Sequence, residues 1–129
     1  MALLFPTEQT PESVLSTIPS TASPADPFFI IFFASPDDTG RSWCGDCRAA
    51  EAPIANNISE QRSALVYAGG RSEWRDPSNA FRRAFGITRL PTIIKVTGAA
   101  SSFSALQKSE MLVEGDVVDE EKLKKFVGV

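Results

Sequence analysis

Residues 27–47, which read PFFIIFFASPDDTGRSWCGDC, decide the fold. The run from Pro27 to Ala34 is continuously apolar, and it is too short to span a membrane. A run of this length predicts a strand buried on both faces, as in a parallel sheet. A polar loop over residues 35–42 follows, and beyond the cysteines the alanine-rich stretch 48–58 consists of good helix formers. The two cysteines therefore lie between a buried strand and the start of a helix.

Cys44 and Cys47 are the only cysteines among 129 residues, and the chain contains no histidine. Two cysteines three positions apart can form one reversible disulfide, and a C-x-x-C pair beside a strand–helix pattern is the thioredoxin-like redox signature. The free N–H groups and the dipole of a helix start favour negative charge. We therefore expect a lowered pKa at Cys44, which would supply the attacking thiolate, and a more buried Cys47 one turn into the helix.

Two other interpretations of the pair are weaker. A structural zinc site takes four ligands, usually cysteine or histidine, and this chain offers two, so no metal is expected. A purely structural disulfide between Cys44 and Cys47 would close a very small loop, which restricts the unfolded chain little. Redox chemistry therefore remains the favoured function.

Composition and length limit the remaining possibilities. The length predicts one domain over residues 1–129 with a hydrophobic core, and 43% hydrophobic with 22% charged residues is ordinary for a soluble protein. The net charge is -3 and no basic block could follow phosphates, so nucleic acid is not an expected partner. The N-terminus lacks the features of a secretory signal, which favours a cytoplasmic protein whose dithiol is kept reduced. A reduced dithiol in that setting would act as an electron donor.

The rest of the chain predicts an α/β fold with a mixed central β-sheet flanked by helices on both faces. Helix starts are predicted at Thr10-Pro11 and Asp76-Pro77, and Gly86 is expected to end the second helix. Residues 98–108 are small and polar, and they predict a mobile hairpin connection. Further strands are expected at residues 3–5, 64–68, 92–96 and 111–113, and a terminal helix at 119–125 is expected to bury Leu123, Phe126 and Val127.

The cysteine pair together with Leu90-Pro91-Thr92 resembles the thioredoxin fold. A narrower resemblance rests on the enlarged loop before Trp43, on the aspartate before the second cysteine, and on the segment Trp74-Arg75-Asp76-Pro77-Ser78-Asn79. This set is similar to the 14-kDa thioredoxin-related proteins, the thioredoxin domain-containing protein 17 family. The resemblance is strongest between Pro27 and Val96. It implies a cis bond before Pro91, facing the cysteines.

The chain departs from that family in three places. Gly45 stands where the family usually has proline, and glycine loosens the helix start. Pro53 lies one residue further from the motif than the family's helix proline, so a kink or a local bulge is expected there. Unlike ordinary thioredoxin, the buried strand 27–34 carries no acid that could help to deprotonate Cys47.

These features assign expected roles. Cys44 would attack a substrate disulfide and Cys47 would release the reduced product. Asp46 either receives the Cys47 proton or only stabilises the helix start through its charge. Trp43 either contacts substrate or simply packs, whereas the backbone of Leu90-Pro91 would pair with an extended substrate.

The resemblance implies a disulfide reductase that binds no cofactor and receives electrons from NADPH through thioredoxin reductase. Its substrates would be small disulfides such as cystine and selected protein disulfides, and we expect a monomer with no membrane association. Two alternatives remain open: a glutaredoxin-like, glutathione-coupled reductase and a non-catalytic thioredoxin-like binding module. The first is weakened because Gly69-Gly70 does not follow the Pro91 strand, where a glutathione site would be expected.

Overall fold

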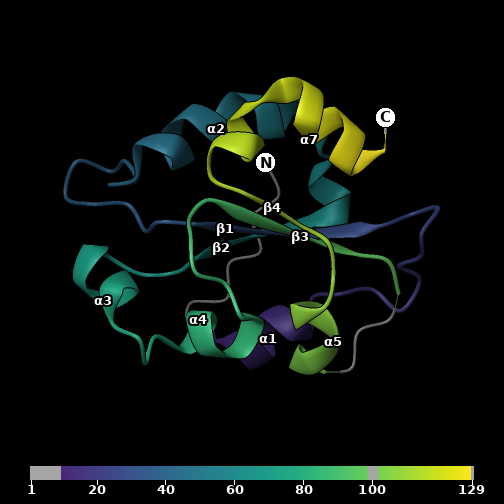
Figure 1. Ribbon diagram of the computed structural model, residues 1–129, viewed down its shortest axis with the longest axis horizontal. Helices are drawn as coiled ribbons and strands as arrows, with labels where there is room; N and C mark the ends of the chain where they lie inside the picture. The colour runs from purple at the N-terminus through teal and green to yellow at the C-terminus, as the bar shows by residue number, and fades with distance from the viewer. Residues whose placement is uncertain (1–9, 99–101, 129) are drawn as a thin grey trace.

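A four-stranded mixed sheet forms the centre of the computed structural model, which describes residues 10–98 and 102–128. In space the strands follow the order β2-β1-β3-β4. β1 runs parallel to β2 and antiparallel to β3, and β4 runs antiparallel to β3 (Figure 1). The strands are β1 (Phe28–Phe33), β2 (Ser63–Tyr67), β3 (Thr92–Val96) and β4 (Met111–Val113).

Helices cover both faces of this sheet, which confirms the predicted fold class. One layer holds α2 (Gly45–Asn57), α6 (Gly115–Val118) and α7 (Glu120–Val127), which contact one another. The opposite layer holds α1, α4 and α5 (Figure 1). The remaining helical bounds are α1 (Pro11–Leu15), α3 (Arg71–Arg75), α4 (Ala80–Phe85), α5 (Phe103–Gln107) and a 3-10 turn at Glu60–Arg62.

Strand β1 is buried on both faces, as its continuous apolar sequence predicts. Every residue from Phe28 to Phe33 is at most 4% exposed. Successive side chains of a strand point to opposite faces, and the two helical layers receive them separately. The Phe29 ring lies 6.0 Å from Phe126 of α7, whereas the Phe32 ring lies 5.0 Å from Phe85 of α4. The strand that leads to the cysteines is therefore held from both sides.

Several predicted helix ends are confirmed. Thr10 caps α1 and Pro11 is its first residue, although the helix ends at Leu15 rather than near Pro19. Gly86, with φ 68°, ends α4 in the left-handed conformation that glycine adopts without strain. The terminal helix begins after its cap, Asp119, and buries its three predicted apolar side chains.

Helix α2 begins at Gly45, three residues before the predicted stretch, so the second half of the motif is itself helical. From there the backbone is α-helical at every residue through Pro53 to Asn57. The local bulge that we considered at Pro53 is absent from this range, and the kink stays a prediction.

The predicted helix start at Asp76-Pro77 is wrong. Asp76 instead ends α3, and its carboxylate accepts the N–H and the hydroxyl of Ser78 at 2.9 and 2.7 Å. Asn79 caps α4, because its side-chain oxygen accepts two N–H groups of the first turn while its amide donates to Ala68 O at 2.9 Å. Asp and Asn are both good caps, and the contact with Ala68, directly after strand β2, favours Asn79.

The predicted hairpin connection at residues 98–108 is also wrong, since it contains helix α5. Ser102 caps this helix by accepting the Ala105 N–H, and Leu106 is fully buried. Helices α3 and α6 were not predicted either, and the predicted strand at residues 3–5 lies outside the described residues. Over residues 10–98 and 102–128, no helix is long and apolar enough to cross a membrane.

Candidate functional site

The enlarged loop before the motif folds back on itself. Pro36 and Ser42 form a β-bridge across its base, and the Asp37 N–H donates to Arg41 O at 2.8 Å. The Asp37 carboxylate also accepts hydrogen bonds from the hydroxyl and the N–H of Thr39, and these two bonds hold its pKa below the usual range. Residues 36–41 are exposed and Ser42 is buried, so the motif starts from a fixed point at Ser42.

Cys44 occupies the N-cap of α2, where its sulfur accepts the Cys47 N–H at 3.2 Å. A hydrogen bond from the Cys47 thiol lowers the pKa of Cys44 to about 7, helped by N–H groups of the helix start and opposed by burial. A thiol with this pKa is about half ionised at neutral pH. The half-buried Cys44 therefore has the properties of an attacking nucleophile.

Cys47 is fully buried one turn further along, as predicted. Its sulfur accepts the Ala34 N–H at 3.5 Å at the end of β1. The hydrogen bond that it donates to Cys44, together with burial, raises the pKa of Cys47 far above the ordinary value. The pair thus consists of one reactive thiolate and one protonated thiol held in reserve.

The segment before β3 meets the cysteines from the other side. The Leu90–Pro91 peptide bond is cis, which confirms the prediction from the resemblance. Leu90 O lies 3.6 Å from the Cys44 sulfur, and the turn is held by a hydrogen bond from Thr92 Oγ1 to Arg89 O at 2.6 Å. The fold therefore brings Leu90 and Pro91 to the sulfurs from more than forty residues away in sequence.

Trp43 ties the motif to the end of β2. Its indole N–H donates to Gly69 O at 3.2 Å, and the Arg71 guanidinium lies 5.1 Å from the centre of its ring. This is the range of a cation–π contact. Trp43 is half-buried beside Cys44, so the packing role has structural support, and contact with substrate stays a prediction.

Asp46 lies exposed in the first turn of α2. A negative side chain there is favourable for the helix. The largest influences on the pKa of the Cys47 thiol come from Cys44, burial, the Ala34 N–H and the Ser42 hydroxyl. The position of Asp46 suits the helix-stabilising role, and its role as a proton acceptor stays a prediction.

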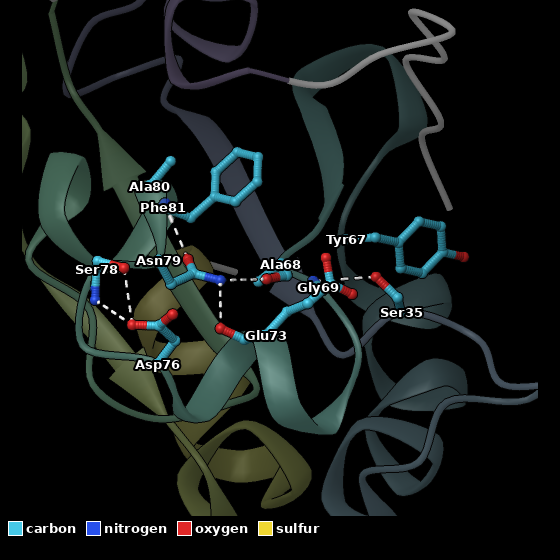
Figure 2. A pocket seen from close by; sticks show the side chains of 10 residues that line it. All are labelled: Ser35, Tyr67, Ala68, Gly69, Glu73, Asp76, Ser78, Asn79, Ala80 and Phe81. Atoms are coloured by element: carbon cyan, nitrogen blue, oxygen red, sulfur yellow. Dashed lines mark hydrogen bonds between the residues drawn. The ribbon is translucent and has the colours of Figure 1, made fainter.

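A cavity of about 520 Å³ is lined in part by Gly69, whose carbonyl accepts the Trp43 N–H. Figure 2 shows that its polar groups bond to one another, with the Asn79 amide donating to Glu73 O at 3.1 Å and the Gly69 N–H donating to Ser35 at 3.0 Å. Neither cysteine lines this cavity. The candidate site is therefore the exposed surface around Cys44. Within the described part of the chain, no three His, Cys, Asp or Glu side chains gather as metal ligands would.

A comparison of the sequence with models of known protein families identifies the family of this chain. Residues 8–120 match the model of the thioredoxin domain of thioredoxin domain-containing protein 17-like proteins. The chain belongs to this family. The match extends beyond the region of strongest sequence resemblance toward both ends, and membership supports a thioredoxin-type redox role.

Individual relatives agree with this family. A thioredoxin domain-containing protein of Schizosaccharomyces pombe is 33% identical over 132 residues, which span 98% of this chain and all of the relative. Human thioredoxin domain-containing protein 17 is 34% identical over 71 residues, 52% of this chain and 58% of the human protein. The thioredoxin-like protein Clot of Arabidopsis thaliana is 39% identical over 77 residues, 54% of this chain and 58% of that protein.

Sequence reasoning missed Ser42, a residue of this thioredoxin-like site that contacts the motif directly. Ser42 is 5% exposed, and its hydroxyl accepts the Cys44 N–H at 3.3 Å while its carbonyl accepts the Arg48 guanidinium. Its hydroxyl is also one of the groups that lower the pKa of Cys47, against the larger opposing effects of Cys44 and burial. A serine at the end of a polar loop gives no sequence signal of burial, so only the folded loop reveals this contact.

Proposed function

We propose that this protein is a disulfide reductase that acts on small disulfides such as cystine and on selected protein disulfides. The observation that carries the proposal is the opposite shift in pKa of the two thiols. The pKa of Cys44 is lowered to about 7, while burial and the hydrogen bond to Cys44 keep Cys47 protonated. This is the arrangement that thiol–disulfide exchange requires, because the thiolate attacks and the second thiol must wait.

The proposed reaction has two halves. Cys44 thiolate attacks one sulfur of the substrate disulfide, forms a mixed disulfide and expels the other substrate half as a thiolate. Cys47 then loses its proton and attacks the Cys44 sulfur, which forms the Cys44–Cys47 disulfide and expels the second half. Two electrons pass from the protein to the substrate. The two product thiolates take up two protons from solvent, which balance the proton that Cys44 lost on ionising and the proton that Cys47 loses before its attack.

Substrate would lie along the surface between Trp43 and Pro91. The cis bond leaves the backbone of Leu90 beside the Cys44 sulfur, with Leu90 O at 3.6 Å. An extended segment carrying a disulfide could pair with backbone groups at this edge while its sulfur meets Cys44. We assign Trp43, Leu90 and Pro91 to substrate binding on this basis.

The oxidised protein must be reduced again in each cycle. We propose that thioredoxin reductase does this with electrons from NADPH, so that the chain itself binds no cofactor and works as a cytoplasmic monomer. Support comes from the family to which the chain belongs. The dithiol carries both electrons within its own two sulfurs, so the exchange itself needs no further redox group.

The test is NADPH oxidation by thioredoxin reductase plus this protein, with cystine and insulin as parallel substrates. Fast cystine reduction with slow insulin reduction is the expected result. Fast reduction of both would indicate a general thioredoxin activity associated with Gly45. Failure with both would overturn coupling to thioredoxin reductase, and a glutathione-coupled assay would follow.

Two variants control this assay. Cys44→Ser removes the nucleophile and should abolish turnover, whereas Cys47→Ser should stop after the first half and trap the mixed disulfide, which mass spectrometry detects. Full biological function of Cys44→Ser would instead favour a non-catalytic binding module.

A further inference from the structure

Two arginines next to the candidate site are already bound to other groups of the protein. The Arg48 guanidinium donates to Ser42 O, and the Arg89 guanidinium lies 3.5 Å from the Glu114 carboxylate. Their N–H groups are therefore shared with the protein, and a substrate would have to compete for them.

Arg71 differs from these two arginines. Its guanidinium carbon lies 5.1 Å from the centre of the Trp43 ring, and no hydrogen bond or ion pair joins its side chain to another described residue. Arg71 is exposed. A guanidinium has five N–H donors, and stacking on an aromatic face leaves the donors at its edge free to bind. Arg71 therefore offers an unshared positive charge against the residue that precedes Cys44.

The backbone from which Arg71 extends is tied to the same ring. Gly69 O accepts the Trp43 indole N–H at 3.2 Å, and the Gly70 N–H donates to the Glu73 carboxylate at 2.9 Å. Arg71 follows directly as the first residue of α3. Because the guanidinium already rests on a ring that is anchored to its own loop, less conformational freedom is lost when a ligand binds it.

The rest of the electrostatic setting opposes anions. The chain has a net charge of -3, and Asp46 is exposed in the first turn of α2, two residues from Cys44. An anionic disulfide would therefore be repelled unless a cation lies on its path. Arg71 is placed to supply that cation, on the Trp43 side of Cys44.

We propose that Arg71 binds a carboxylate of the substrate, so that the protein prefers disulfides with a carboxylate a few atoms from the sulfur. This inference rests on the proposed reductase function and names a substrate class for the same site. A substrate half that approaches Cys44 along the Trp43 ring meets the guanidinium, whose planar edge can form two parallel hydrogen bonds to a carboxylate. Cystine, which carries a carboxylate on each half, belongs to this class.

The test uses three disulfides of similar shape and different charge: dithiodipropionate, a dianion, hydroxyethyl disulfide, which is neutral, and cystamine, a dication. Each oxidises the reduced protein in excess, at neutral pH and low salt, without a reductase. Acid stops the reaction, and mass spectrometry counts the protein thiols that a maleimide still labels. Each variant is compared with the unaltered protein for the same disulfide, which cancels the intrinsic reactivity of the reagent.

In Arg71→Gln we expect the rate constant with dithiodipropionate to fall about three- to fivefold, as for the loss of an exposed charge pair. The rate constant with hydroxyethyl disulfide should stay the same, and that with cystamine should rise. Added salt should reduce the difference between the variant and the unaltered protein, because it screens exposed charges. Arg71→Lys keeps the charge and should recover part of the loss.

Arg75→Gln is the matched control. It removes the same charge from an exposed position of the same helix, and among the ring contacts of the described residues its guanidinium does not lie on Trp43. All three rate constants should stay close to those of the unaltered protein.

The outcomes are distinct for the two proposals. Equal rate constants in Arg71→Gln and the unaltered protein, equal slowing with all three disulfides, or the same selective loss in Arg75→Gln would each overturn carboxylate binding by Arg71 and leave the reductase proposal intact. If none of the three disulfides oxidises the unaltered protein, the reductase proposal itself is wrong.

Discussion

At the residue scale, the two cysteines differ because of what surrounds them. Both have the same side chain, yet Cys44 lies half-buried at a helix cap and Cys47 lies fully buried against the end of β1. The hydrogen bond between them acts in opposite directions, since it lowers the pKa of Cys44 and raises that of Cys47. This one hydrogen bond therefore favours the thiolate form of Cys44 and the protonated form of Cys47.

This coupling predicts how the reactivity of Cys44 depends on pH. Alkylation of the reduced protein by iodoacetamide should accelerate as pH rises, with a midpoint of about 7, because only the thiolate reacts. Cys47→Ala removes the largest cause of the lowered pKa, so the midpoint should move upward and the rate at neutral pH should fall. Cys47→Ser retains a hydroxyl donor and should shift the midpoint less. Identical midpoints in the unaltered protein and Cys47→Ala would contradict this account.

At the element scale, helix α2 has a start that would accept proline. Gly45 is its first residue, where proline is favoured because the N–H has no partner within the helix. Cys44, with φ -90° and ψ 117°, already has the extended backbone that a following proline requires. A Cβ at Gly45 would approach nothing closer than the Arg48 side chain, at 3.8 Å.

Gly45→Pro should therefore stabilise the protein. We expect the free energy of unfolding to rise by about 0.4–1 kcal/mol, because proline reduces the conformational freedom of the unfolded chain. Urea denaturation of the reduced protein measures this change. Gly86→Ala is the contrasting variant and should destabilise, since Gly86 has φ 68° and its added Cβ would lie 3.1 Å from Gln107. A loss of stability in Gly45→Pro would show that the helix start is not relaxed as described.

At the scale of the whole molecule, α5 closes the layer of helices that includes α1 and α4. The Phe103 ring lies 5.3 Å from Phe85, which in turn contacts Phe32 of the central strand. The Gln107 amide donates to Ala84 O at 2.8 Å. Helix α5 therefore packs against the hydrophobic core, although its sequence has the composition of a loop.

Leu106→Ala tests this continuity. Leu106 is fully buried in α5, and truncation of a buried leucine leaves a cavity that costs about 2–5 kcal/mol. Chemical denaturation should show a loss in this range, with a smaller loss for Leu15→Ala at a half-buried position of α1. Equal small losses in both variants would mean that α5 does not belong to the core.

The sequence by itself determined the features that depend on neighbouring residues. The uninterrupted apolar run predicted a strand buried on both faces, and two cysteines at the following helix start predicted one nucleophile with a lowered pKa and one more buried partner. Family resemblance predicted the cis bond at Pro91. Only the tertiary structure decided that Asn79 rather than Asp76 caps α4, that residues 103–107 form a helix that buries Leu106, and that the Ser42 hydroxyl accepts the Cys44 N–H. Such features depend on contacts between distant segments, which local periodicity does not record.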